Sequence, residues 1–199
     1  MTHRPPAANP TSRPAFRASP VPVVGFVGSS GSGKTTLIAA LIPHLGQAGL
    51  RVAVLKHARH GFDLDRPGKD SFRAREAGAA QVLVASRDRW VLMAETPEGS
   101  AEPDFRTLLG RFNPSEIDLV LAEGFAGEAY PKIEVYRPAH GEPPKCWPHD
   151  PHVRALATDA MVVVPPPTTR LDLNRPDQIA DYLITEFCSV PCKAALHAD

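Results

Sequence analysis

The sequence predicts an α/β protein built on a mostly parallel sheet, with helices on both faces and a β-strand extension. Three observations lead to this fold. A buried strand at 21–27 feeds a glycine-rich loop that opens a helix at about 34–47. A second apolar strand follows at 51–56, and a strand–helix–strand unit with short loops has parallel strands and a right-handed crossover. Further apolar strands alternate with amphipathic helices along the rest of the chain.

The later elements are predicted from apolar periodicity and from turn residues. In order, we expect a short helix that starts at Asp70 or Ser71 and ends near Gly78, strands at 81–85 and 89–94, a helix around 105–112, strands at 117–122, 132–137, 153–157 and 161–164, and a helix from about 174 to 187. The pair at 81–94 reads as a hairpin that adds antiparallel strands to the parallel sheet.

Composition limits the class of protein. Of the 199 residues, 43% are hydrophobic and 22% charged, as in ordinary globular domains, and the formal net charge is +0. A neutral chain gives no electrostatic argument for a nucleic-acid partner. No apolar run reaches the roughly 20 residues of a membrane helix, so we expect no membrane partner. Three cysteines without a regular framework favour a reducing compartment.

One domain with two tails is the predicted organisation. Residues 1–20 are rich in proline and arginine and contain no acid, so they cannot bury a core and should be disordered. Residues 21–187 carry all the predicted elements and form the nucleotide-binding domain. Residues 188–199 read as a flexible C-terminal tail with two free thiols, Cys188 and Cys192.

The glycine-rich loop at 28–35 matches the phosphate-binding pattern G-x-x-x-x-G-K-[ST] without a mismatch, between a strand and a helix as that motif requires. Its backbone N–H groups and the helix start would bind phosphate oxygens. Lys34 would reach the outer phosphates, and the Thr35 hydroxyl would bind Mg²⁺. The predicted phosphate-binding residues are Gly28, Ser29, Gly31, Ser32, Gly33, Lys34, Thr35 and Thr36. The sequence therefore predicts a P-loop NTPase fold.

A magnesium site of this kind needs an acid at the end of a second buried strand. Glu123 is the candidate, because an apolar strand leads into it and a glycine follows. The alternative is a surface glutamate at a strand end. Asp118 is the rival acid, but it lies where the strand begins, at the opposite edge of the sheet.

The polar stretch 56–71 is too long and too charged for a simple connection, and it starts where a parallel strand ends, the side on which α/β sheets bind ligands. Its imidazoles and carboxylates could bind a transition metal, although a loop gathered around phosphates and Mg²⁺ is the favoured interpretation. The candidate residues for a second ligand or for contact with the nucleotide are His57, His60, Asp63, Asp65, Lys69 and Arg73. Arg73 and Arg75 cannot face the same way on a helix, so one of them would be a solvated charge.

The same stretch resembles the signature of the molybdopterin-guanine dinucleotide biosynthesis protein B (MobB) family. The matching segments are Lys56-His57-x-x-His60, Phe62-Asp63-x-Asp65-x-Pro67-Gly68-Lys69-Asp70-Ser71-x-Arg73, Ala77-Gly78-Ala79, Asp118-Leu119-Val120-Leu121-x-Glu123-Gly124-Phe125, Pro131-Lys132-Ile133-Glu134-Val135, Ala157-Thr158-Asp159 and Leu171-Asp172-Leu173-Asn174. The chain departs at Arg59, where the family usually has a histidine. The block from 63 to 73 is far more specific than the P-loop.

This resemblance implies a cytoplasmic, dimeric, GTP-binding accessory protein that uses Mg²⁺ and is at most a weak GTPase. It implies a partner guanylyltransferase (MobA-like) that joins GMP to molybdopterin, with molybdopterin as a possible ligand near Lys69 or Arg73. From the residues alone two other functions stay open. One is a P-loop kinase of a small molecule, with Asp63 or Asp65 as base, and the other is a scaffold without catalysis whose long loop is ordered by nucleotide.

Overall fold

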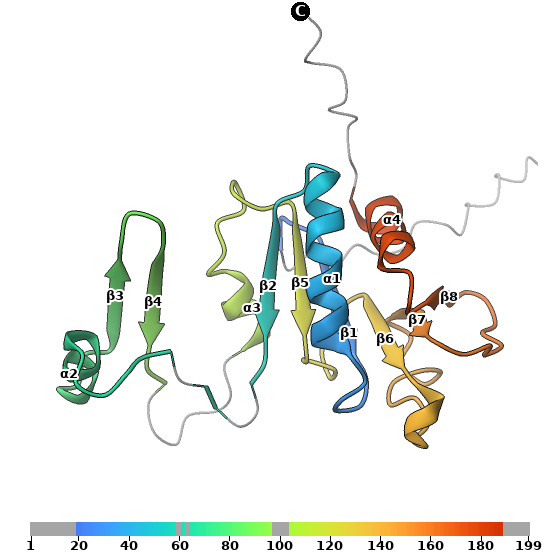
Figure 1. Cartoon of the computed structure of the whole chain (residues 1–199), viewed down its shortest axis with the longest axis horizontal. Helices are drawn as coiled ribbons and strands as arrows, with labels where there is room; N and C mark the ends of the chain where they lie inside the picture. Colours follow the sequence, from blue (N-terminus) through green and yellow to red (C-terminus); the bar gives the residue numbers. More distant parts are fainter. Residues whose placement is uncertain (1–18, 59–60, 63, 97–103, 189–199) are drawn as a thin grey trace, which may run out of the picture.

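The computed structural model describes residues 19–58, 61–62, 64–96 and 104–188 (Figure 1). The predicted tails lie almost wholly outside these ranges. The strands are β1 (Val23–Val27), β2 (Val52–Lys56), β3 (Gln81–Ala85), β4 (Trp90–Ala94), β5 (Leu119–Glu123), β6 (Lys132–Tyr136), β7 (Val153–Thr158) and β8 (Thr169–Asp172). The helices are α1 (Lys34–Gln47), α2 (Asp70–Glu76), α3 (Phe105–Leu109) and α4 (Pro176–Phe187), with a 3-10 turn at Pro138–His140.

A six-stranded sheet forms the body of the described chain, in the order β2-β5-β1-β6-β7-β8 with parallel neighbours throughout. From β1 the chain goes first to β2 at one edge and later places β5 between them; it then continues on the other side of β1 with β6, β7 and β8, so the direction of the connections reverses between β1 and β6. In open α/β sheets ligands bind beside such a reversal, at the carboxyl ends of the strands. The P-loop follows β1 and therefore starts at this point.

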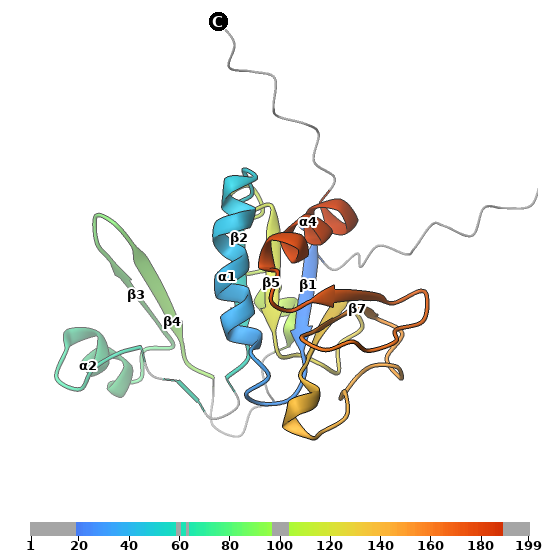
Figure 2. The same ribbon diagram turned by 45° about the vertical axis from the view of Figure 1, so that its right-hand side comes forward.

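Helices cover both faces of the sheet, as predicted (Figures 1 and 2). The apolar stripe of α1 packs with α4 over one face, where Leu41, Leu45 and Leu183 are fully buried. On the other face Phe105 of α3 packs against Tyr130 and Val120. β1 lies between these two layers with all five residues buried, which explains its continuous apolar sequence.

Two predictions about strands are wrong. Residues 161–164 form no strand; the edge strand is β8, in which Leu171 is buried and the other three residues are exposed. Pro165 directly after that run supplies no N–H for a ladder. The predicted hairpin does form, with β3 and β4 antiparallel, but it is a separate two-stranded sheet and adds nothing to the parallel one. With α2 it stands apart from the body (Figure 1).

No helix in the described ranges is long and apolar enough to cross a membrane.

Candidate functional site

The P-loop joins β1 to α1 and has the backbone shape that its glycines allow. Gly28 has φ 131°, and a Cβ there would lie 2.3 Å from the carbonyl oxygen of Val135, so only glycine fits. The residue before α1 is Gly33, which is left-handed and provides no side-chain cap. The start of the helix therefore presents backbone N–H groups, and no capping side chain, to an anion.

Two side chains of the loop show how it could receive a phosphate. The Lys34 ammonium folds back over the loop and donates to the carbonyl oxygens of Gly28 (3.1 Å) and Ser29 (2.7 Å). Ser32 Oγ is buried and, among the described residues, has no hydrogen-bond partner. A buried hydroxyl without a partner is costly, and a phosphate oxygen would satisfy it. Phosphates therefore fit the loop both in charge and in hydrogen bonding.

The structure brings Thr35 and Glu123 together from segments 88 residues apart. The Thr35 hydroxyl donates to the Glu123 carboxylate, with its Oγ1 2.8 Å from Oε1 and 2.9 Å from Oε2. Hydroxyl and carboxylate oxygens are ligands that Mg²⁺ prefers, so this pair fits the ion. The predicted place of Glu123 at the end of a buried strand is confirmed, while its role as a metal acid stays a prediction.

A third group, the Lys56 ammonium, lies beside Thr35 and Glu123 and was not predicted from the sequence as a site residue. The ammonium of Lys56 lies 3.1 Å from Thr35 Oγ1 and 3.2 Å from Glu123 Oε2. Lys56 ends β2 and pairs in register with Glu123 at the end of β5. Only the strand order makes them neighbours, although both stand at the end of an apolar strand, which is a signal that the sequence did contain.

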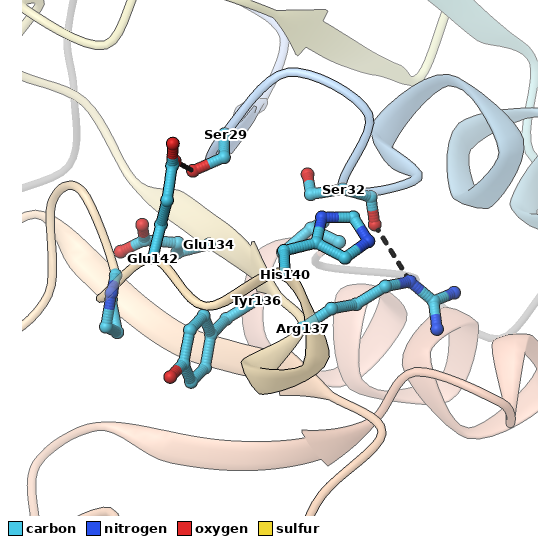
Figure 3. A pocket seen from close by; sticks show the side chains of 9 residues that line it. Ser29, Ser32, Glu134, Tyr136, Arg137, His140 and Glu142 are labelled. Atoms are coloured by element: carbon cyan, nitrogen blue, oxygen red, sulfur yellow. Dashed lines mark hydrogen bonds between the residues drawn. The ribbon is translucent and has the colours of Figure 1, made fainter.

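On its other side the P-loop is held by Arg137, which directly follows β6. Arg137 Nε donates to the carbonyl oxygen of Ser32 (3.1 Å), and Nη1 bonds Asp159, at the end of β7 (2.5 Å; Figure 3 shows the bond to Ser32). The contact fixes the peptide plane that follows Ser32. Neither residue was singled out in the sequence as a site residue, because an arginine after a strand is common.

A small cavity of about 10 Å³, the size of one water molecule, lies between the P-loop and the segment after β6 (Figure 3). Ser29 and Ser32 line one side, and Arg137, His140 and Glu142 line the other. Ser29 Oγ donates to Glu142 Oε2 at 2.8 Å across the cavity mouth. The segment after β6 therefore touches the phosphate loop directly, at the reversal of strand order.

The second polar loop starts beside the Thr35–Glu123 pair. The backbone N–H of His57 donates to the carbonyl oxygen of Glu123 (3.0 Å), and its ring stacks on Phe125 at 5.1 Å between centroids. Phe125 has φ 52°, a left-handed value that is rare outside glycine, and it follows the left-handed Gly124. His57 is thus anchored close to the candidate metal residues.

The rest of that loop belongs with the hairpin. Asp65 accepts hydrogen bonds from Ser71 (2.9 Å) and Arg75 (3.5 Å), and Arg75 also bonds Glu95. Of the two arginines, Arg75 is thus the paired one and Arg73 is exposed, as is Lys69. Arg59, His60 and Asp63 lie outside the described residues, and so do their proposed roles.

Asp118 lies at the opposite edge of the sheet, as expected for a residue at the entry of its strand. Its carboxylate takes two hydrogen bonds from the Arg51 guanidinium, at 2.9 and 3.0 Å. Asp118, the alternative to Glu123, is therefore paired with Arg51 at the side of the sheet opposite to the P-loop.

Comparison with known proteins gives a consistent result. The family model "Molybdopterin guanine dinucleotide synthesis protein B" (MobB) matches residues 23–159. The chain is 43% identical over 164 residues to the molybdopterin-guanine dinucleotide biosynthesis adapter protein of Escherichia coli K12, covering 82% of this chain and 92% of the relative. The Haemophilus influenzae adapter protein is 42% identical over 169 residues, with 84% and 90% covered. The crystal structure of Bacillus subtilis MobB superposes with a TM-score of 0.65 at 25% identity, covering 85% of this chain and 99% of that one.

Proposed function

The chain belongs to the MobB family, and we propose that it is a GTP-binding adapter in the formation of molybdopterin guanine dinucleotide. The observation that carries the proposal is the hydrogen bond between Thr35 and Glu123 at the head of the P-loop. It joins the two motifs that a metal–nucleotide complex requires. Two relatives that match over more than 80% of this chain are named as adapter proteins of this biosynthesis.

The proposed ligand is GTP with Mg²⁺. The P-loop backbone from 28 to 35 and the Thr36 N–H would hold the phosphates, with Lys34 on the outer ones. Thr35 and Glu123 would hold Mg²⁺, Glu123 usually through water. When bound, the ion neutralises charge on the β- and γ-phosphate oxygens.

An adapter role fits a protein that hydrolyses GTP weakly at most. Among the described residues, Arg137 contacts the P-loop, and its guanidinium is bonded to Ser32 and Asp159. We therefore assign the transfer of GMP to a partner guanylyltransferase, and we place the protein in the cytoplasm with it. The exposed Lys69 and Arg73 offer positive charge for a second anion, for which a molybdopterin phosphate is the proposed source.

The protein is further proposed to act as a homodimer through the β3–β4 hairpin. Large apolar side chains are exposed there, with 67% of Trp90 and 60% of Leu83 accessible. A two-stranded sheet alone is marginally stable, so it gains from pairing with a second copy. Sedimentation equilibrium should give a dimer for the wild type and a monomer for Leu83→Lys; a monomeric wild type would contradict this part of the proposal.

A titration of GTP and ATP with Mg²⁺ in excess tests the nucleotide assignment. We expect the wild type to prefer GTP. Lys34→Ala should weaken binding by about 10- to 100-fold, because each charge-assisted hydrogen bond contributes about 1.5–3 kcal/mol. Lys145→Ala, which removes an exposed lysine outside the site, is the matched control and should bind as the wild type does.

Clear preference for ATP would contradict the assignment of GTP. Unchanged affinity in Lys34→Ala, with thermal unfolding like that of the wild type, would contradict the P-loop site altogether.

A further inference from the structure

Lys56 is placed by the sheet itself against the two side chains that would bind Mg²⁺. Its register partner in the neighbouring parallel strand is Glu123, and register partners in a sheet point to the same face. The ammonium then reaches both Glu123 Oε2 (3.2 Å) and Thr35 Oγ1 (3.1 Å). A cationic group thus stands at the candidate metal position.

The hydrogen bonds at Thr35 show that the ammonium and Mg²⁺ need the same atom. A hydroxyl has one proton and two lone pairs. Thr35 directs its proton to the Glu123 carboxylate and accepts from Lys56 through a lone pair. Mg²⁺ held by Thr35 would use that oxygen as well, and a divalent cation there would repel the Lys56 ammonium from the pair.

We propose that Lys56 and Mg²⁺ are alternative cations for the Thr35–Glu123 pair. Without the metal, the Lys56 ammonium balances the Glu123 charge and supplies positive charge to the outer phosphates of a bound nucleotide. With the metal, Lys56 leaves these oxygens. This inference rests on the proposed nucleotide site and assigns to Lys56 a role in setting how strongly that site depends on Mg²⁺.

The contact has the properties of an exchangeable pair. The Lys56 side chain is 50% exposed, so its ammonium can return to water along a flexible stem. Exposed ion pairs contribute only about 0–1 kcal/mol, which a divalent ion can readily replace. Glu123, at 13% exposure, is the more fixed partner and stays in place to receive the ion.

The backbone around Lys56 is anchored, so the exchange is confined to its side chain. The next residue, His57, donates its N–H to the Glu123 carbonyl oxygen (3.0 Å) and stacks on Phe125. A Cβ at Gly124 would lie 3.0 Å from the His57 Cβ, which shows how closely the two strand ends approach. Metal binding therefore need not move β2.

The test compares nucleotide affinity with Mg²⁺ in excess and with EDTA, in the wild type, Lys56→Met and the control Lys145→Met. Methionine keeps the length and apolar stem of Lys56 and removes its charge. Without Mg²⁺ we expect Lys56→Met to bind GDP about two- to five-fold more weakly than the wild type, the range of an exposed ion pair. With Mg²⁺ the two should bind alike, and the variant should need less Mg²⁺ for half-maximal binding.

A second readout follows the lysine directly. Reductive methylation with ¹³C-formaldehyde keeps the charge and gives each lysine an NMR signal, and Lys56→Met identifies the one from Lys56. This signal should shift when Mg²⁺ is added to the GDP complex, whereas that of Lys145 should not.

Three outcomes would overturn the proposal. Equal weakening of Lys56→Met with and without Mg²⁺ would make Lys56 a direct phosphate ligand. Affinities of Lys56→Met equal to those of the wild type both with and without Mg²⁺, or a Lys56 signal that does not shift with Mg²⁺, would make the contact incidental. Each of these outcomes leaves the proposed function intact. A wild type that binds no guanine nucleotide, with or without Mg²⁺, would instead contradict the proposed function, and this inference with it.

Discussion

All strands of the six-stranded sheet are parallel, so they begin along one side of the sheet (the amino edge) and end along the other (the carboxyl edge). A lysine–carboxylate pair lies at each of these two sides, and the two pairs differ in exposure to solvent. At the amino edge Lys132 begins β6 and lies 2.6 Å from Asp150, with 1% of its side chain exposed. At the carboxyl edge Lys56 ends β2 and lies 3.2 Å from Glu123, with 50% of its side chain exposed. Both pairs join a lysine to a carboxylate, but one pair is enclosed and the other is open to solvent.

At the amino edge both members of the Lys132–Asp150 pair have further hydrogen-bond partners. The Lys132 ammonium also donates to the Ala126 carbonyl oxygen at 2.7 Å. Burial by itself raises the pKa of Asp150, but hydrogen bonds from Lys132 and His152 outweigh it and hold the pKa below its ordinary value. Such a pair is structural: its charges are satisfied within the protein, and none remains for a ligand.

Glu134, two residues further along β6, is likewise a buried carboxylate whose hydrogen bonds are satisfied within the protein, in this case by a loop. Its buried carboxylate accepts the backbone N–H groups of Lys145 (2.5 Å), Cys146 (3.1 Å) and Trp147 (2.7 Å). The proline-rich segment after β6 is therefore tied to the sheet, which keeps Glu142 against the P-loop. The comparison teaches that burial and saturation of hydrogen bonds, and not residue type, separate a structural charge from an exchangeable one.

The largest expected effect comes from breaking the buried pair. Asp150→Ala leaves the Lys132 ammonium buried without its counter-charge, and this should lower the free energy of unfolding by about 3–5 kcal/mol. Urea denaturation followed by circular dichroism measures it. Nucleotide affinity of the folded fraction should not change, because the pair lies at the edge opposite to the P-loop.

The double variant Lys132→Met/Asp150→Ala is the control for this prediction. It removes both charges, so it should recover much of the stability lost in Asp150→Ala. A double variant less stable than Asp150→Ala would mean that the Lys132 ammonium stabilises this edge even without Asp150, through its hydrogen bond to the Ala126 carbonyl oxygen.

The smallest effect should come from breaking the Arg51–Asp118 ion pair. This pair tests whether burial, or position at the amino edge, determines how much an ion pair stabilises the fold. The pair lies at the amino edge too, and its two hydrogen bonds are well formed, but 54% of the arginine side chain is exposed. We expect Arg51→Ala to shift the urea midpoint slightly, and 1 M salt to reduce the difference from the wild type because exposed pairs are screened. A loss comparable to that of Asp150→Ala would show that position at this edge matters more than burial.

Much of the fold was predictable from local sequence, and so were the P-loop and Glu123 of the candidate site. The P-loop needs glycines, a lysine and a threonine in consecutive positions, so one stretch carries all its chemistry. Glu123 was predictable because a buried strand followed by an acid and a glycine is also a local pattern. The hairpin was predicted for the same reason. Its separation from the parallel sheet was not predicted, because the sequence of 81–94 does not indicate whether these strands also pair with the parallel ones.

The errors have physical causes of the same kind. The run 161–164 is apolar, yet sheet membership is decided by hydrogen bonding to a neighbour, and β7 pairs instead with β8. Asp65 was expected beside the nucleotide; its contacts with Ser71 and Arg75 lie within the α2–hairpin unit, and its role at the nucleotide stays a prediction. Lys56 and Arg137 were missed because their importance comes from what the fold places next to them.

By itself, the sequence determined that this chain has a P-loop between a strand and a helix, a candidate acid at 123 and the signature of the MobB family. Only the tertiary structure decided which groups surround that loop. Strand order sets β2 beside β5 and β6 beside β1, and parallel register then brings Lys56 to Glu123, and Arg137 to Ser32. Local motifs follow from the conformational needs of adjacent residues, whereas these contacts follow from strand pairing across the whole chain, which no single stretch encodes.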